Sequence, residues 1–146
     1  MTSENIILLI EDSAEDAELT LRAFRKGNAL NEFVIVRDGL EALDYLRDYG
    51  SHAGQQPKTL PALILLDLNL PKISGLEVLR RLRAEERTRR IPVVVLTGSD
   101  EEGDLLSSHD LGANRFIVKP VDFARLAAAA RQLGLYRLVT NEPIRE

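Results

Sequence analysis

Residues 62–71 read ALILLDLNLP, and this stretch decides the fold. Five apolar residues follow one another without alternation, which is typical of a strand buried on both faces, as in a parallel sheet. Asp67 ends the apolar run. Parallel α/β sheets bind ligands at the carboxyl ends of their strands, so Asp67 indicates a functional site at the end of this strand.

Four other short apolar runs have the same character, and they lie at residues 6–10, 33–36, 92–96 and 115–118. Glu11 and Asp12 follow the first of them. The last two runs stop at Thr97 and at Lys119. Acids, a hydroxyl and a lysine at the ends of different buried strands make a site rather than a core, so we expect these side chains to lie together.

The segments between the runs are predicted to be helices, because most of them begin with a capping box, in which a side chain satisfies an orphan backbone N–H. The pairs are Ser13/Asp16, Asp38/Glu41, Ser74/Glu77 and Ser99/Glu102, and Asp122 is a fifth candidate cap. Strands that alternate with helices predict an α/β fold, a doubly wound parallel sheet with helices on both faces. Residues 51–61 lack periodicity and contain one Gly and two Pro, which indicates a long surface loop.

Length and composition exclude several classes of protein. A chain of 146 residues predicts one domain. The absence of cysteine excludes disulfides and thiolate chemistry, and His52 and His109 are too few for a histidine metal cluster. A net charge of −4 does not favour nucleic-acid binding. No apolar stretch approaches the roughly 20 residues that span a bilayer, and the start lacks a signal peptide, so we expect a cytoplasmic protein that binds neither nucleic acid nor membranes.

The acids point to a magnesium site. Three carboxylates in one crevice repel one another unless a cation intervenes, and an all-oxygen donor set suits Mg²⁺. Any one of these acids could instead be a helix cap or a solvated side chain, but the combination of Glu11, Asp12 and Asp67 weakens that alternative. Asp67 could also act as a nucleophile, because aspartyl carboxylates form covalent phosphoryl intermediates.

The lysine and the hydroxyl each have two interpretations. Lys119 is either a surface lysine at a turn or a point charge that pairs with a carboxylate or a phosphate. Thr97 and Gly98 are either a plain turn or a hydroxyl donor beside a small residue that leaves room for an anion. If Asp67 takes a phosphoryl group, Lys119 and Mg²⁺ would neutralise the transferring group.

Together these motifs resemble one known family. The matching residues are Glu11-Asp12-Ser13, residues 67–75 (DLNLPKISG), Thr97-Gly98 and Lys119-Pro120. Their order and spacing are similar to those of a response-regulator receiver domain of bacterial two-component signalling, the CheY-like family. The resemblance implies a five-stranded sheet of order 2-1-3-4-5. Residues 37–43, the 51–61 loop and the tail after Leu133 further resemble the small stand-alone regulators partnered with bacterial and cyanobacterial phytochromes.

The resemblance implies how the acids would act. Asp67 would accept a phosphoryl group from the histidine of a sensor kinase, here a phytochrome kinase. Asp12, Asp67 and the backbone carbonyl of Asn69 would coordinate Mg²⁺, with Glu11 acting through water.

The remaining motif residues would respond to the phosphoryl group. Lys119 would bind a phosphoryl oxygen, and the Lys119–Pro120 bond is expected to be cis. Thr97 would move its hydroxyl toward the phosphate. Phe116 is either the aromatic that follows Thr97 in the switch or a plain core aromatic. Because it lacks a tyrosine hydroxyl, a switch at Phe116 would work through packing.

We expect residues 1–133 to form the receiver domain and residues 134–146 a C-terminal extension. No output domain is expected, so the output would be a contact with a kinase, a phosphotransfer protein or a second copy of the chain. The apolar tail at 133–139 either continues the last helix on its own domain or joins that helix in a dimer surface. The arginines from Arg80 to Arg90 are either a solvated face favoured by the helix dipole or a contact for an acidic partner.

Three other functions stay open from the residues themselves. A metal-dependent aspartyl phosphatase would place Asp-x-Asp after its first strand, whereas Asp67 follows the third and Asn69 replaces the second acid. A flavodoxin-like FMN protein needs a hydroxyl-rich loop after its first strand, where Glu11 and Asp12 would repel phosphate. A scaffold that no longer takes phosphate would not need the complete set of acids, hydroxyl and lysine.

Overall fold

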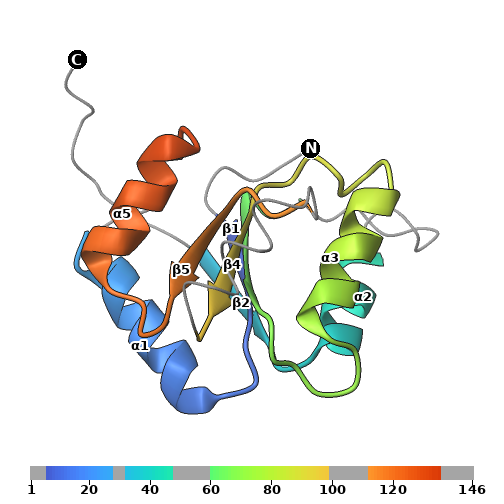
Figure 1. Cartoon of the computed structure of the whole chain (residues 1–146), viewed down its shortest axis with the longest axis horizontal. Coiled ribbons are helices and arrows are strands. Elements are labelled where there is room, and N and C mark those ends of the chain that lie inside the picture. The colour runs from blue at the N-terminus through green and yellow to red at the C-terminus, as the bar shows by residue number, and fades with distance from the viewer. Residues whose placement is uncertain (1–5, 28–31, 48–59, 99–111, 136–146) are drawn as a thin grey trace.

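The computed structural model describes residues 6–27, 32–47, 60–98 and 112–135 (Figure 1). Its strands are β1 (Ile6–Ile10), β2 (Glu32–Val36), β3 (Leu63–Asp67), β4 (Val93–Thr97) and β5 (Arg115–Val118). Its helices are α1 (Ala14–Arg25), α2 (Gly39–Arg47), α3 (Gly75–Ala84) and α5 (Phe123–Gln132). Each strand lies within one residue of its predicted bounds. The helix predicted to begin at Ser99 and most of the loop predicted at 51–61 lie outside the described residues.

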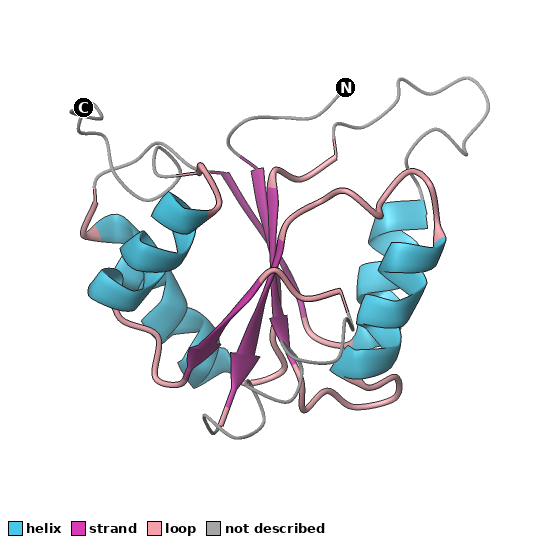
Figure 2. Ribbon diagram, turned by 45° about the horizontal axis from the view of Figure 1, so that its top comes forward, coloured by secondary structure: helices cyan, strands magenta, loops and turns pink. Residues whose placement is uncertain are grey.

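The five strands are parallel and hydrogen-bonded in the order β2-β1-β3-β4-β5, which confirms the predicted fold. Helices α1 and α5 cover one face of the sheet, and α2 and α3 cover the other, as Figure 2 shows. Parallel strands bring all their carboxyl ends to one edge. Asp67 and Thr97 are the last residues of β3 and β4 and therefore lie at that edge.

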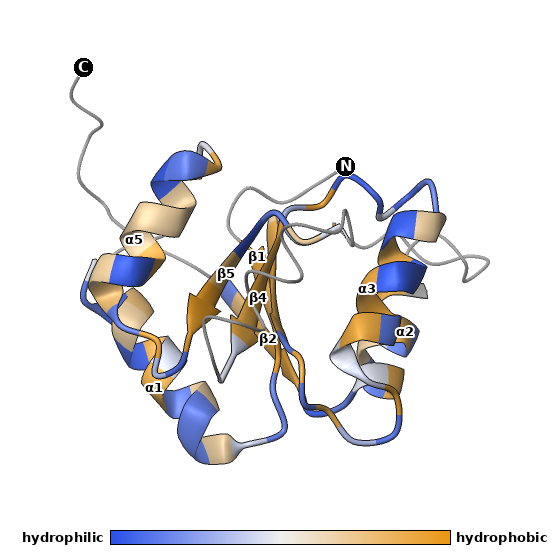
Figure 3. Ribbon diagram, viewed as in Figure 1, coloured by the Kyte–Doolittle hydropathy of each residue, from blue (hydrophilic) through white to orange (hydrophobic). Residues whose placement is uncertain are grey.

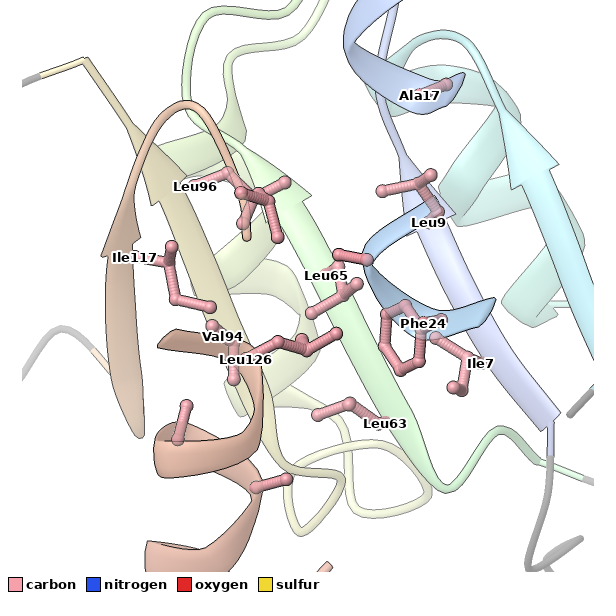
Figure 4. Close-up of a cluster of buried hydrophobic side chains, with 14 residues drawn as sticks. Ile7, Leu9, Ala17, Phe24, Leu63, Leu65, Val94, Leu96, Ile117 and Leu126 are labelled. Carbon is pink, nitrogen blue, oxygen red and sulfur yellow. The ribbon is translucent and has the colours of Figure 1, made fainter. Parts of the chain in front are cut away.

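Burial on both faces explains why the strands are apolar throughout. In β1, Ile7 and Leu9 join the core cluster on the α1 and α5 side, whereas Leu8 and Ile10 join the cluster on the α2 and α3 side. Figure 3 shows hydrophobic residues concentrated along the strands, and Figure 4 shows Phe24 of α1 packed among the strand side chains. Burying one such side chain contributes roughly 1.5–3 kcal/mol, so the sheet is a stable platform for the groups at its edge.

Side-chain caps fix where the helices begin. Ser13 Oγ accepts from the Asp16 N–H at 3.1 Å, and Ser74 Oγ accepts from the Glu77 N–H at 3.2 Å. Asp38 Oδ1 accepts from the Glu41 N–H, and Asp122 Oδ1 accepts from the Arg125 N–H, each at 2.8 Å. These four caps lie in the loops that follow β1, β2, β3 and β5. Each cap therefore turns the chain into a helix close to the edge that carries Asp67.

The last described helix ends in a left-handed turn. Gly134 has a φ of 73°, a conformation that glycine adopts without steric cost. The Leu135 N–H donates to the Ala130 carbonyl at 2.7 Å and the Gly134 N–H to the Arg131 carbonyl at 3.1 Å, which is the Schellman pattern that closes a helix. Helix α5 therefore stops at Gln132 and does not run on through Leu135, and residues 136–146 lie outside the described part. Within the described ranges, no helix has both the length and the apolar content that crossing a membrane requires.

Arg83 ties together three segments at the opposite edge of the sheet, where the strands begin. Its guanidinium donates to the carbonyls of Gly112, Arg89 and Ile91 at 2.8–2.9 Å and to Asn114 Oδ1 at 2.9 Å. Asn114 Oδ1 also accepts from the first backbone N–H of β4 at 2.8 Å. A Cβ at Gly112, where φ is 97°, would collide with the Arg83 side chain. This single side chain therefore joins α3 to the starts of β4 and β5.

The other arginines near the end of α3 lie on the surface. Arg80 and Arg81 pair with Glu77 at 3.2 and 3.1 Å. Arg87, Arg89 and Arg90 are exposed in the turn that leads to β4. Pairs of this kind at a surface contribute little to stability, and the helix dipole favours positive charge at this end. This exposure agrees with either interpretation of the set, a solvated face or a contact for an acidic partner.

We expect Arg83→Ala to lower the free energy of unfolding by about 2–4 kcal/mol, because it removes four hydrogen bonds and leaves the partly buried carbonyls of Gly112 and Ile91 without their donor. Arg80→Ala is the matched control, since the Arg80 side chain is 74% exposed and its loss should change stability by less than about 0.5 kcal/mol. Urea unfolding of both variants measures the difference. Equal stability of the two variants would contradict the role given to Arg83.

Candidate functional site

The ends of β1 and β3 bring three carboxylates together. One oxygen from each of Glu11, Asp12 and Asp67 lies within 4.8 Å of the others. Glu11 and Asp67 are buried, whereas Asp12 is exposed. The Glu11 N–H donates to the Val36 carbonyl at 3.0 Å, which fixes this residue beside the end of β2. The acids that the sequence singled out therefore face one small space, and they leave it open to solvent at Asp12.

Lys119 reaches this space from the end of β5. Its Nζ lies 2.8 Å from Glu11 Oε1 and 3.2 Å from Asp67 Oδ2. Its backbone N–H donates to the Thr97 carbonyl at 2.8 Å, and the Lys119–Pro120 bond is cis. A lysine beside two buried carboxylates offsets part of their charge, so Lys119 is a member of the site and not a surface lysine at a turn.

Burial and mutual repulsion decide the charges in the site. Burial, followed by the neighbouring Asp67, raises the pKa of Glu11 from 4.5 to about 7. Burial by itself would lower the pKa of Lys119, but contacts with Glu11 and Asp16 and the charge of Asp67 raise it above its ordinary value. Lys119 is therefore a permanent cation at neutral pH, whereas Glu11 takes up a proton readily.

The site also fits a divalent cation with oxygen ligands. Glu11 Oε1 is buried and has no hydrogen-bond partner among the described residues, although it lies at ionic distance from Lys119. One lysine faces three carboxylates, so negative charge remains. A cluster of carboxylates that outnumbers the lysine beside it, at a place open to solvent, matches the donor chemistry of Mg²⁺.

The loop after β3 holds Asp67 in place. The Asn69 N–H donates to Asp67 Oδ1 at 3.1 Å, and the Gly75 N–H donates to the Leu68 carbonyl at 3.1 Å. A Cβ at Gly75 would collide with the Asp67 carbonyl oxygen, so the start of α3 can approach the end of β3 because this residue is glycine. Lys72, at a φ of 67°, pairs with Asp38 at 3.3 Å across the next loop.

Thr97 and Phe116 lie beside the acids on β4 and β5. Thr97 is buried as the last residue of β4, next in sequence to Leu96, which pairs with Asp67. Gly98 has open space where a side chain would be. Phe116 is partly buried against the α2 and α3 cluster, and it also lines a cavity of about 380 Å³ between β5 and α5. This placement agrees with either interpretation of Phe116.

One member of the site was missed at the sequence level. Asp16 Oδ2 accepts a hydrogen bond from Lys119 Nζ at 3.0 Å, across 103 positions of sequence. From the sequence, Asp16 is interpreted only as part of the capping box with Ser13. Helical spacing gave no signal for the contact, because Asp12 precedes the Ser13 cap and lies outside the helix.

A family model, the response regulator receiver domain, matches residues 7–131. The chain belongs to this family. Two curated relatives have similar identity. A protein named "Probable methanogenesis regulatory protein FilR2" of Methanothrix harundinacea is 41% identical over 93% of this chain and 85% of its own length. Response regulator Rcp1 of Synechocystis is 42% identical over 78% of this chain and 76% of its own length.

Solved structures agree with this assignment. The bacteriophytochrome response regulator RtBRR has a TM-score of 0.83 at 47% identity, over 99% of this chain and 85% of its own. The phosphorylated cyanobacterial phytochrome response regulator RcpA has a TM-score of 0.71 at 39% identity, over 93% and 95%. The Mn²⁺-bound form of Rcp1 has a TM-score of 0.70 at 34% identity, over 97% and 99%. The chain is therefore a response regulator of two-component signalling, similar to the regulators of phytochromes.

We expect Glu11→Gln to stabilise the metal-free protein at pH 8 by about 3 kcal/mol, since the pKa of Glu11 rises from 4.5 to about 7 and one pKa unit corresponds to about 1.4 kcal/mol. The folded protein binds the Glu11 proton more tightly than the unfolded chain, because its pKa rises from 4.5 to about 7. The stability of the unmodified protein should therefore fall as pH rises through this window, and the Gln variant should lack this decline. Urea unfolding between pH 5 and pH 8 measures the stability of both proteins as a function of pH. Parallel pH profiles would contradict the raised pKa of Glu11.

Proposed function

We propose that Asp67 is the phosphoacceptor of this response regulator. The single observation that carries the proposal is the position of Lys119 Nζ, 3.2 Å from the buried Asp67 carboxylate. A carboxylate oxygen of Asp67 attacks the phosphorus of a phosphohistidine, the P–N bond breaks, and the histidine nitrogen leaves with the bonding electron pair. Lys119 stabilises the negative charge on the transferring oxygens, as preorganised cations do in phosphoryl transfer.

The metal would be held by the same acids. Asp12, Asp67 and the carbonyl of Asn69 are the proposed Mg²⁺ ligands, with Glu11 acting through water. When bound, the ion supplies positive charge against phosphate oxygens. The cluster of three carboxylates and the solvent-open side at Asp12 support this proposal, and so does the Mn²⁺-bound form of Rcp1.

Thr97 and Phe116 are the proposed route from the phosphate to a binding surface. Thr97 ends β4 in a buried position, so its hydroxyl has a short path to a phosphoryl group on Asp67. On the neighbouring strand, Phe116 pairs with Val95, which is two residues before Thr97 on β4. Phe116 would respond to a movement of Thr97 by repacking. Phosphorylation adds about −1.5 to −2 charge and three strong acceptors, which is sufficient to draw the hydroxyl toward it.

The competing functions fit less well. An aspartyl phosphatase needs an acid or base two residues after its nucleophile, and that position holds the amide Asn69. An FMN phosphate would meet the carboxylates of Glu11 and Asp12 after β1. The complete carboxylate and lysine set also disfavours a scaffold that takes no phosphate.

The upstream partner is a sensor histidine kinase, as for the family, and we propose that it is a bacteriophytochrome kinase in the cytoplasm. The similarity to RtBRR supports the choice of kinase. We also propose that residues 1–133 form the receiver domain and that residues 134–146 extend it, with α5 and this extension forming a homodimer surface.

Incubation with Mg²⁺ and acetyl phosphate should add one phosphoryl group to Asp67, because the donor replaces the kinase. Mass spectrometry should show an acid-stable, base-labile mass gain that Asp67→Asn abolishes. The exposed Asp122→Asn is the matched control and should be modified at the unchanged rate. A mass gain that survives in Asp67→Asn would contradict the assignment.

The same measurement with phosphorylated kinases as donors tests the partner. A bacteriophytochrome kinase should transfer its phosphoryl group faster than an unrelated histidine kinase at equal concentration. Equal rates would contradict a phytochrome partner while leaving Asp67 as the acceptor.

Removal of residues 134–146 should shift the monomer–dimer equilibrium of the phosphorylated protein toward monomer by at least tenfold, because it removes part of the proposed surface. Analytical ultracentrifugation measures the equilibrium. Phosphorylation of the truncated protein to the same level as the full-length protein serves as the control for its folding. An unchanged equilibrium would contradict the proposal that the extension is part of the dimer surface.

A further inference from the structure

Asp16 approaches the site from a helix, whereas the three clustered acids come from strand ends. It lies in the first turn of α1, where its N–H is bound by Ser13 and its carbonyl accepts from Thr20 Oγ1 at 3.1 Å. These bonds fix its backbone on both sides. From this position its carboxylate meets Lys119 Nζ at 3.0 Å.

The three carboxylates around Lys119 are not equivalent. Glu11 Oε1 lies 2.8 Å from Nζ and Asp67 Oδ2 lies 3.2 Å from it. The contact with Asp16 has both the distance and the geometry of a hydrogen bond. Glu11 and Asp67 also belong to the cluster that fits a cation, whereas Asp16 does not. Asp16 is therefore the partner of Lys119 that neither a bound cation nor a phosphoryl group would draw away.

We propose that Asp16 is a positioning residue that holds the Lys119 ammonium beside Asp67 during phosphoryl transfer, and this inference rests on the proposed function. Lysine carries its charge on a flexible four-carbon stem, so an ammonium without an anchor samples several positions. Asp16 fixes one of them from the side of α1. Transfer then begins with the cation in place, which avoids the entropic cost of ordering it in the transition state.

The anchor also connects α1 mechanically to the chemistry. Asp16 and the Ser13 cap belong to the same helical turn. A partner that displaces this turn would move the acceptor of the Lys119 hydrogen bond. The rate at Asp67 therefore depends on the position of α1, although no side chain of α1 contacts the phosphorus in this scheme.

The test compares Asp16→Asn with Glu15→Gln in the full-length protein. Both changes remove one negative charge from the first turn of α1, but Glu15 is exposed and lies outside the Lys119 contacts. With saturating Mg²⁺ and acetyl phosphate, Asp16→Asn should form the phosphorylated protein about tenfold more slowly, as expected when a neutral amide replaces the carboxylate that accepts from Lys119. Glu15→Gln should stay within about twofold of the unmodified protein, and the Mg²⁺ dissociation constant should change by less than about twofold in both.

A second readout does not need phosphorylation. A hydrogen-bonded lysine ammonium exchanges its protons slowly, so the ¹⁵Nζ signal of Lys119 should be observable in the unmodified protein and in Glu15→Gln. It should broaden or disappear in Asp16→Asn. In a Lys119→Met background, Asp16→Asn should have no further effect on the residual rate, because residues that act through one contact are not additive.

Each outcome decides one of the two claims. An unchanged Nζ signal or an unchanged phosphorylation rate in Asp16→Asn overturns the positioning role. The role is also overturned if Glu15→Gln slows phosphorylation as much as Asp16→Asn does, or if Asp16→Asn slows the residual reaction equally in the Lys119→Met background. Absence of phosphorylation in the unmodified protein overturns the proposed function. The Nζ signal would still report whether Asp16 holds Lys119.

Discussion

The structure depends on the balance of charge between one lysine and the carboxylates at the edge of the sheet. Glu11 and Asp67 are almost fully buried, and charged groups in such positions are costly unless they are paired. Lys119 pairs with both, and Asp16 adds a third contact to it. The lysine does not neutralise the whole cluster. The site therefore retains negative charge in its metal-free form, which suits a protein that binds a cation and then a phosphoryl group.

The fold supplies this arrangement through simple means. Parallel strands direct their last residues to one edge, and the caps turn the chain into helices directly beyond it. The core under the edge consists of fully buried side chains, so the groups above it are held by a stiff support. At the opposite edge, Arg83 joins α3 to β4 and β5 through bonds to carbonyl groups. The acids and the lysine of the site therefore lie at the carboxyl ends of the strands, whereas the hydrogen bonds of Arg83 connect the elements at the opposite end.

The sequence predicted much of this because the relevant signals are local. Apolar runs defined the strands, and the Ser13, Asp38, Ser74 and Asp122 caps are present as expected. The convergence of Glu11, Asp12 and Asp67 followed from the geometry of parallel strands. The bond between Asp16 and Lys119 was missed because it depends on the rotation of α1 over the sheet. The role of Arg83 was missed because backbone carbonyls, which every residue carries, have no sequence signature.

The surface arginines of α3 have a consequence for the whole molecule. In the described part of the chain, Arg80, Arg81, Arg87, Arg89 and Arg90 lie near the edge where the strands begin, whereas Glu11, Asp12 and Asp67 lie where they end. This separation places an excess of positive side chains near one end of the strands and acids at the other, although Glu77 and Glu85 offset part of the positive charge. A charged partner would turn the domain before touching it, and at physiological ionic strength that torque extends over a Debye length of about 8 Å. The same arginines that contribute little to stability would therefore affect how the acidic edge is turned when such a partner approaches.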